Sequence, residues 1–134
     1  MSIPHKAKII AHLQAEFGSL MAIYAFGSRI QGTATPTSDL DLAILVEGKA
    51  DPLALWNASA DLGILLDHDV DLLDFRAAST VMQARILDTG ERWWVRDEQA
   101  SIYEAFVLSE KLRLNELRAG ILKDIQESGR IYGE

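Results

Sequence analysis

The chain has 134 residues, of which 49% are hydrophobic and 25% charged, as is usual for one globular domain. Its formal net charge of -7 argues against a protein that holds long nucleic acid, because such proteins need a basic surface. Cysteine is absent, which excludes disulfides and thiolate metal sites. No apolar run is long enough to cross a bilayer and no secretory leader is evident, so we expect a cytoplasmic protein.

Hydrophobic spacing predicts the elements of the first part of the chain. Residues 4–16 have helical periodicity, and the continuous apolar run 20–26 predicts a buried strand. Residues 27–38 are rich in Gly, Ser, Thr and Pro, which indicates a loop with one helical turn. Residues 39–46 first alternate between polar and apolar and then become wholly apolar, which favours a second strand.

The second part of the chain continues in the same way. Asp51 is the expected N-cap of the next helix, with Pro52 at its first position. The elements predicted from there are a helix at 52–65, a strand at 68–75, a helix at 77–87, a short edge strand at 93–95 and a long C-terminal helix from about 99 to 127. We therefore predict one α/β domain over residues 1–134, with a small mixed sheet, flanking helices and a long C-terminal helix.

The most informative segment joins the first two strands. Gly27 and Ser28 follow the first strand, and Asp39 and Asp41 come at the start of the second. Residues two apart in a strand point to the same face, so the two carboxylates are expected side by side. Such a pair binds Mg²⁺ together with phosphate oxygens, and paired metals can activate an attacking oxygen and stabilise a leaving one. Gly27 permits close approach of the backbone to a phosphate, and Ser28 offers a hydroxyl and N–H groups.

Each half of this segment is common by itself. A Gly-Ser pair is often an ordinary turn, and a D-L-D-L run is often a strand with one solvated face. Their combination is more specific: G-S, ten residues and D-x-D resemble the signature of the DNA polymerase beta-like nucleotidyltransferase superfamily. The segment FGSRIQGTATPTSDLDLAILV is similar to that of its minimal nucleotidyltransferases, which act as antitoxins beside HEPN-domain ribonucleases.

The resemblance implies a third acidic residue on a later strand, acting as a base or as metal support. We expect Asp71 in this role and a metal set of Asp39, Asp41 and Asp71, with Asp69 as the alternative. Asp69 and Asp71 share a strand face, whereas Asp74 should point the other way. A fully solvated strand end is the competing interpretation.

Other polar and aromatic residues are ambiguous. Arg29 follows the Gly-Ser turn and is expected either to bind phosphate bidentately or to be a solvated loop residue. The three histidines have no recognisable metal-ligand spacing, so we expect exposed or hydrogen-bonded roles for them. Of Trp93 and Trp94, one should lie in the core and the other at the surface. The C-terminal helix is expected to be mainly core.

Three functional hypotheses follow. The resemblance implies a Mg²⁺-dependent protein adenylyltransferase, an antitoxin that transfers AMP from ATP to a tyrosine of a HEPN ribonuclease. Nucleotide binding would then involve Gly27, Ser28 and Arg29. The second hypothesis is a small-molecule nucleotidyltransferase of the aminoglycoside-modifying kind, which the absence of a further acceptor domain disfavours. The third is a non-catalytic antitoxin that acts by occlusion, which the intact set of acidic residues disfavours.

Overall fold

The computed structural model describes the backbone of residues 5–132 and the side chains up to residue 126. The elements in chain order are α1 (Lys6–Glu16), β1 (Leu20–Phe26), α2 (Ser28–Gln31), β2 (Leu40–Val46), α3 (Pro52–Leu66), β3 (Val70–Asp74), the 3-10 turn η1 (Phe75–Ala77), α4 (Thr80–Thr89), β4 (Glu91–Val95) and α5 (Gln99–Tyr132). This confirms the predicted order of elements, including the short strand near Trp93 and Trp94.

A mixed sheet forms the centre of the fold, with strand order β3-β2-β1-β4. β1 pairs antiparallel with β2 and with β4, whereas β2 and β3 are parallel. Residues of β1 are buried along its whole length, because β1 is central and has helices on both faces. The predicted small mixed sheet with flanking helices is therefore confirmed.

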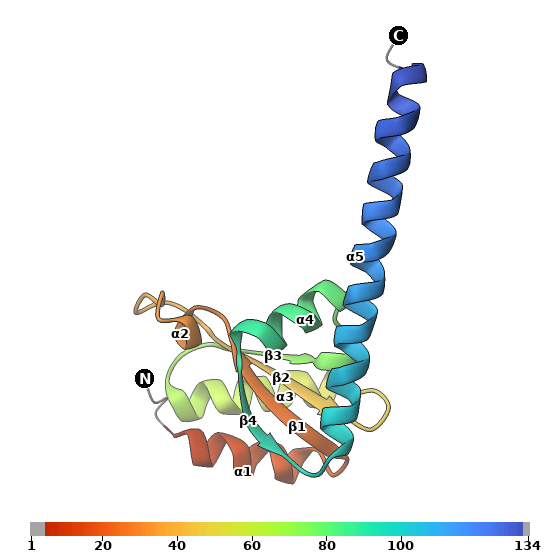
Figure 1. The fold of residues 1–134 in the computed structure, drawn as a ribbon. Helices are drawn as coiled ribbons and strands as arrows, with labels where there is room; N and C mark the ends of the chain where they lie inside the picture. The colour runs from red at the N-terminus through yellow and green to blue at the C-terminus, as the bar shows by residue number, and fades with distance from the viewer. Residues whose placement is uncertain (1–4, 133–134) are drawn as a thin grey trace.

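The two faces of the sheet carry separate apolar cores. One core packs α1 and α3 against side chains such as Leu40, Leu42 and Leu72. The other packs α4 and the first turns of α5 against Ala43, Leu45 and their neighbours (Figure 1). Successive strand residues alternate between these cores, and burial of each large apolar side chain contributes about 1.5–3 kcal/mol.

Several helix boundaries follow from local chemistry. The Asp51 side chain accepts a hydrogen bond from Leu53 N–H, which confirms the predicted N-cap of α3. The predicted start of α4 at residue 77 was wrong, because the 3-10 turn η1 comes first and Ser79 caps α4. Asp39 was predicted inside the second strand but lies one residue before β2. The periodicity of Ala7, Ile10, Leu13 and Phe17 predicted the buried face of α1. Leu13 and Phe17 are buried, but Ala7 is exposed and Ile9 is fully buried instead.

The long helix α5 has two different halves. Ala100 and Val107 are buried against the domain, and Tyr103 packs partly against the same core. Beyond these turns the helix projects away from the domain (Figure 1), and its apolar residues Leu117, Ile121 and Ile125 are at least half exposed. The expectation that α5 is mainly core therefore applies only to its first turns. Within the described residues, no helix has the length and apolar character needed to cross a membrane.

Candidate active site

The pairing of three strands brings the predicted carboxylates together at one end of the sheet. In the parallel register of β2 and β3, Asp41 lies directly beside Asp71. In the antiparallel register of β1 and β2, Asp41 lies opposite Phe26, the residue before Gly27. Neighbouring residues in a register point to the same face, so Asp41 and Asp71 share the face covered elsewhere by α4 and α5. The register thus joins the Gly-Ser turn and two of the three predicted aspartates.

Gly27 is required in the turn for two reasons. Its φ of 82° with ψ of -164° belongs to a region that is open essentially only to glycine. In addition, a Cβ built at this position would collide with Oδ2 of the Asp41 carboxylate. The glycine therefore lets the backbone of the turn approach the carboxylate, as a site for a shared metal and phosphate group requires.

Ser28 begins the four-residue helix α2 directly after this glycine. The Gly27 carbonyl accepts hydrogen bonds from Ile30 and Gln31 N–H, which closes the turn and leaves the first N–H groups of α2 without an intrahelical partner. The Arg29 Nε donates to the Ser38 carbonyl at 2.9 Å, so this side chain ties the two ends of the loop together. The remaining donors of the Arg29 guanidinium can still face an anion, so both interpretations of Arg29 retain support.

The electrostatics of the cluster favour a bound cation. Burial, together with the charges of Asp71 and Asp39, raises the pKa of the Asp41 carboxyl above its ordinary value. Within the described residues, Asp39, Asp41 and Asp71 take part in no side-chain hydrogen bond or ion pair. Among the described residues, ligand atoms of these three aspartates do not all lie within 4.8 Å of one another, so they do not form a closed metal site by themselves. Neighbouring carboxylates without a basic partner nevertheless fit a divalent cation shared with phosphate, because Mg²⁺ prefers carboxylate and phosphate oxygens.

Asp69, just before β3, and Asp74, at the end of β3, have different surroundings from Asp71. Asp69 precedes the strand and is exposed, and its backbone carbonyl accepts from Leu40 N–H. Asp74 points to the opposite face from Asp71, as predicted, and is 8% exposed. Its carboxylate accepts hydrogen bonds from the N–H groups of Ala50 and Arg76, both at 3.1 Å. Asp74 therefore has a structural role, and the register favours Asp71 over Asp69 as the neighbour of Asp41.

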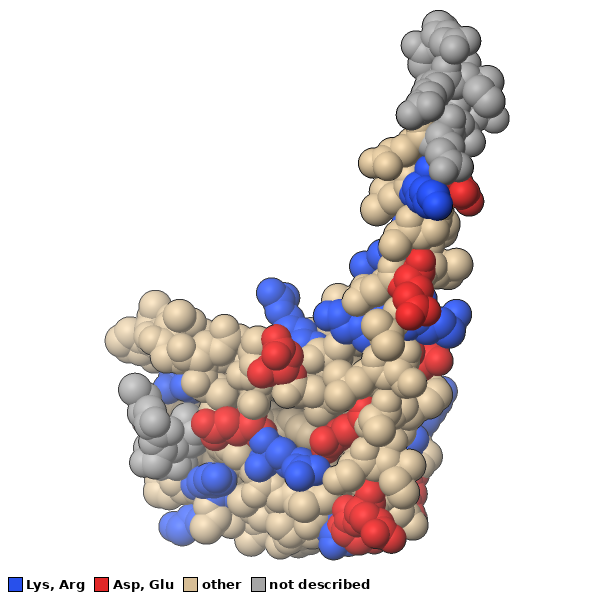
Figure 2. All heavy atoms as spheres, in the orientation of Figure 1, with Lys and Arg blue, Asp and Glu red and all other residues tan. Residues whose placement is uncertain are grey.

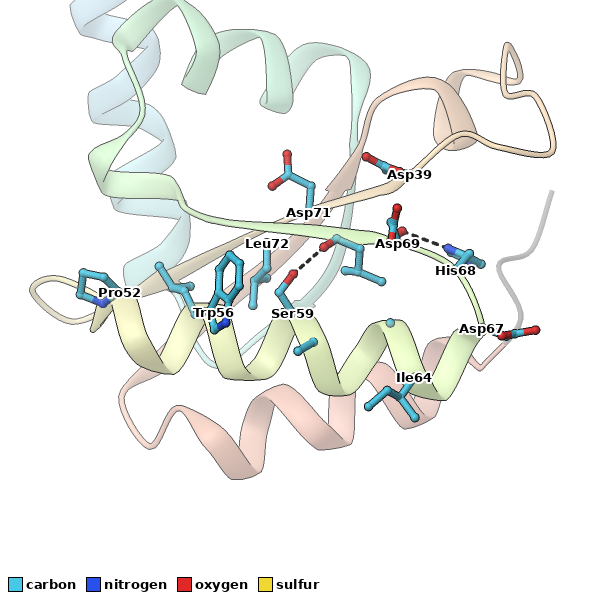
Figure 3. A pocket seen from close by; sticks show the side chains of 14 residues that line it. Asp39, Pro52, Trp56, Ser59, Ile64, Asp67, His68, Asp69, Asp71 and Leu72 are labelled. Carbon is cyan, nitrogen blue, oxygen red and sulfur yellow. Dashed lines mark hydrogen bonds between the residues drawn. The ribbon is translucent and has the colours of Figure 1, made fainter.

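A groove of about 970 Å³ runs between β3 and α3. It reaches Asp39 and Asp71 of the acidic cluster and the neighbouring Asp69. Figure 3 shows Asp39 and Asp71 on the side of β3 away from α3, whereas Trp56 and Leu72 lie between the two elements. The sequence analysis missed Trp56, although it lies on the opposite side of α3 from the buried Ala58 and Leu62 and is 73% exposed. Leu53 and Ile64 of the same helix are also more than half exposed, so Trp56 carried no distinct signal in the sequence.

The remaining ambiguous residues have ordinary surroundings. Trp93 is buried and Trp94 is partly buried, but both pack against the core beside α1. The predicted alternation is wrong here, because the register between β1 and β4 shifts between Ile23 and Tyr24. His68 lies on the groove, and its ring shares a hydrogen bond with the Asp69 carbonyl (Figure 3). His12 contacts Asp61 instead of the acidic cluster.

Comparison with known families identifies the arrangement. A family model described as Polymerase beta, Nucleotidyltransferase matches residues 7–99, a range that includes the turn and all three aspartates. The chain belongs to this nucleotidyltransferase family. One relative of this nucleotidyltransferase is protein adenylyltransferase MntA of Shewanella oneidensis, which is 35% identical over 118 residues, 88% of this chain and 85% of MntA.

Solved structures of toxin–antitoxin complexes share the fold of this nucleotidyltransferase. A chain of a toxin–antitoxin structure with AMP-PNP matches with a TM-score of 0.79 and 34% identity, covering 90% of this chain and 98% of that chain. A second match comes from a tri-AMPylated Shewanella oneidensis HEPN toxin in complex with its MNT antitoxin. Its TM-score is 0.73 with 30% identity, covering 91% of this chain and 96% of that chain.

Proposed function

We propose that this nucleotidyltransferase is a cytoplasmic antitoxin that transfers AMP from ATP to a tyrosine of a partner HEPN ribonuclease. The observation that carries the proposal is the register that joins Asp41 to Asp71 beneath the Gly27 turn. The likeness to MntA over most of both chains supports the choice of reaction. The structures of similar chains with AMP-PNP and with an AMPylated HEPN toxin support ATP as the donor and a protein as the acceptor.

In the proposed reaction, the tyrosine hydroxyl oxygen bonds to the α-phosphorus of ATP and the bond from that phosphorus to the bridging oxygen breaks. Pyrophosphate leaves, and the exposed Asp71 carboxylate accepts the hydroxyl proton. Asp39, Asp41 and Asp71 would hold Mg²⁺, which supplies charge stabilisation for the phosphate oxygens when bound. The Ser28 hydroxyl and the free N–H groups of the turn would orient the triphosphate.

The free half of α5 fits the partner in this proposal. The helical stripe that begins with the buried Val107 continues through Leu114, Leu117, Ile121 and Ile125, beyond the end of the domain. Figure 2 shows basic and acidic side chains interspersed with uncharged surface along this part of the helix. An apolar stripe with charged borders is typical of helix docking in a protein interface. A partner bound here would be held beside the domain that carries Asp39, Asp41 and Asp71.

The exposed stripe also suits an antitoxin that acts by occlusion alone. The two functions differ in what remains after separation, since inhibition by binding ends when the complex is taken apart, whereas an AMP group stays attached. To distinguish them, the partner ribonuclease is incubated with this protein and Mg²⁺-ATP, purified under denaturing conditions, refolded, weighed by intact-mass spectrometry and assayed.

We expect a partner whose mass has increased by one or more AMP groups and which stays inactive after refolding. The matched control is the Asp39→Asn/Asp41→Asn protein, which should leave the partner unmodified while its circular dichroism matches that of the wild type. An unmodified, fully active partner after incubation with the wild type would exclude the transferase. Transfer by the double variant at the wild-type rate would exclude these aspartates from the mechanism.

A further inference from the structure

A second group of metal-binding side chains lies between α1 and α3. His12 and Glu16 are four residues apart and therefore share one side of α1, and Asp61 faces them from α3. One ligand atom from each side chain lies within 4.8 Å of the others, and no further group within the described residues meets this spacing. Since α1 and α3 pack on the sheet face opposite to Asp41 and Asp71, this group is separate from the active site.

The His12 ring carries the unexplained atom of the group. Its Nε2 is inaccessible to solvent and has no hydrogen-bond partner among the described residues. The nearest acceptor, Oδ2 of Asp61, is 3.6 Å away, which is too long for a hydrogen bond. Buried polar atoms in native proteins are nearly always paired. An imidazole nitrogen aimed at a carboxylate without bonding to it suits an ion that both can bind.

The charges of this group and its access to solvent also favour a bound cation. No Lys or Arg of the described chain forms an ion pair with Glu16 or Asp61, so His12 is the only basic side chain that the described residues place at Asp61. The Asp61 side chain is 53% exposed and that of His12 29%, which leaves a route from solvent. A divalent cation at this place would neutralise the carboxylates and link the two helices.

The donor set selects the kind of ion. Imidazole with carboxylates favours Zn²⁺ and similar transition metals, whereas Mg²⁺ prefers oxygen ligands alone. Nitrogen and oxygen ligands about 2.0–2.2 Å from a tetrahedral Zn²⁺ lie about 3.4 Å apart. The 3.6 Å separation between His12 and Asp61 is already close to that value. We propose that His12, Glu16 and Asp61 form a Zn²⁺ site, completed by water, that joins α1 to α3.

The competing explanation is a simple ion pair between protonated His12 and Asp61, and calorimetric titration with ZnCl₂ distinguishes the two. The titration uses the full-length Asp39→Asn/Asp41→Asn protein at pH 7.5, which removes competing carboxylates at the active site. We expect one Zn²⁺ per chain and a higher melting temperature with Zn²⁺. Because only the folded state joins the ligands, the gain should increase with Zn²⁺ concentration. Millimolar Mg²⁺ should not displace the ion.

Two variants locate the ion. His12→Ala and, at a more exposed position, Asp61→Asn should each weaken Zn²⁺ binding at least tenfold. The matched control is His68→Ala, which removes another histidine with acidic neighbours and should leave Zn²⁺ binding unchanged. Absence of saturable binding, affinity unaffected by both site variants, or loss of binding in His68→Ala would each overturn the site. Since the measurement needs no transfer activity, its result is independent of the proposed function.

Discussion

Acidic residues at the two ends of the sheet differ in whether they have hydrogen-bond partners. At one end, Asp41 and Asp71 are neighbours in the register, have no basic partner among the described residues and repel each other. At the other end, Asp74 is buried and each of its oxygens accepts a backbone N–H. Only a short stretch of β3 separates Asp71 from Asp74. An aspartate whose oxygens accept hydrogen bonds within the fold stabilises the fold, whereas aspartates without such partners are available for a ligand.

The largest expected effect is the loss of AMP transfer when an aspartate at the Asp41–Asp71 end of the sheet is replaced. Asp71→Asn should lower kcat/KM for AMP transfer about 10²–10⁴-fold, because the proton acceptor is lost while the side-chain volume is kept. Asp69→Asn is the matched control and should retain most of the activity, since Asp69 is not the residue beside Asp41. Single-turnover assays with labelled ATP measure both. A stronger defect in Asp69→Asn than in Asp71→Asn would reverse the assignment of the third carboxylate.

A smaller loss is expected at the turn. Ser28→Ala removes a hydroxyl donor to charged phosphate, typically a loss of about 1.5–3 kcal/mol, or roughly ten- to hundredfold in transfer efficiency. Thermal unfolding should be nearly unchanged, since the Ser28 side chain makes no hydrogen bond within the described part of the chain. Thr33→Ala serves as the control, because Thr33 contacts Ser28 only through its backbone N–H and its side chain makes no hydrogen bond within the described residues. Wild-type ATP kinetics in Ser28→Ala would remove Ser28 from the site.

At the Asp74 end of the sheet, the expected effect of a substitution is on stability. Asp74→Ala should lower the free energy of unfolding by about 1–3 kcal/mol, because Ala50 and Arg76 N–H lose their acceptor. Asp71→Ala, on the same strand but exposed, should change it by about 0.5 kcal/mol or less. Urea unfolding of the two variants gives both values. Equal destabilisation would contradict the contrast between the two ends.

The smallest effect concerns the pH dependence of stability. The pKa of Asp41 is raised in the folded state, so its protonated form favours folding, and this contribution is lost as the pH rises from about the ordinary value of 3.8. With a chelator present, Asp41→Asn should therefore melt above the wild type at pH 7, and the difference should shrink towards acidic pH. A melting difference that is independent of pH would show that the pKa of Asp41 is not raised in the folded state.

Sequence patterns were sufficient where the signal is local. The uninterrupted apolar run of β1 gave its bounds, and the spacing from Gly27 to Asp39 and Asp41 indicated the candidate site. Asp39 nevertheless lies just outside β2, because alternation alone does not show where pairing begins. The η1 turn delays the start of α4. Asp74 caps this turn by accepting from Arg76 N–H, while Ala50 N–H, from a distant part of the chain, also donates to the Asp74 carboxylate.

Other features depend on residues far apart in the chain and have no local signal. The adjacency of Asp41 and Asp71 requires the register between β2 and β3, and the close approach of Gly27 to Asp41 requires the register between β1 and β2. His12 and Asp61 meet only because α1 packs beside α3. The stripe on α5 has one periodicity throughout, so the sequence could not show that its later turns leave the domain.

The projecting half of α5 would make the lifetime of this protein depend on whether a partner is bound. A helix without tertiary contacts opens independently of the domain, and its frayed state is what proteases cleave. Its exposed Leu117, Ile121 and Ile125 also favour unspecific association when many copies are free. A partner that covers this segment would slow both processes, so copies in complexes would outlast copies in excess. The abundance of the protein would then follow that of its partner without any separate sensor.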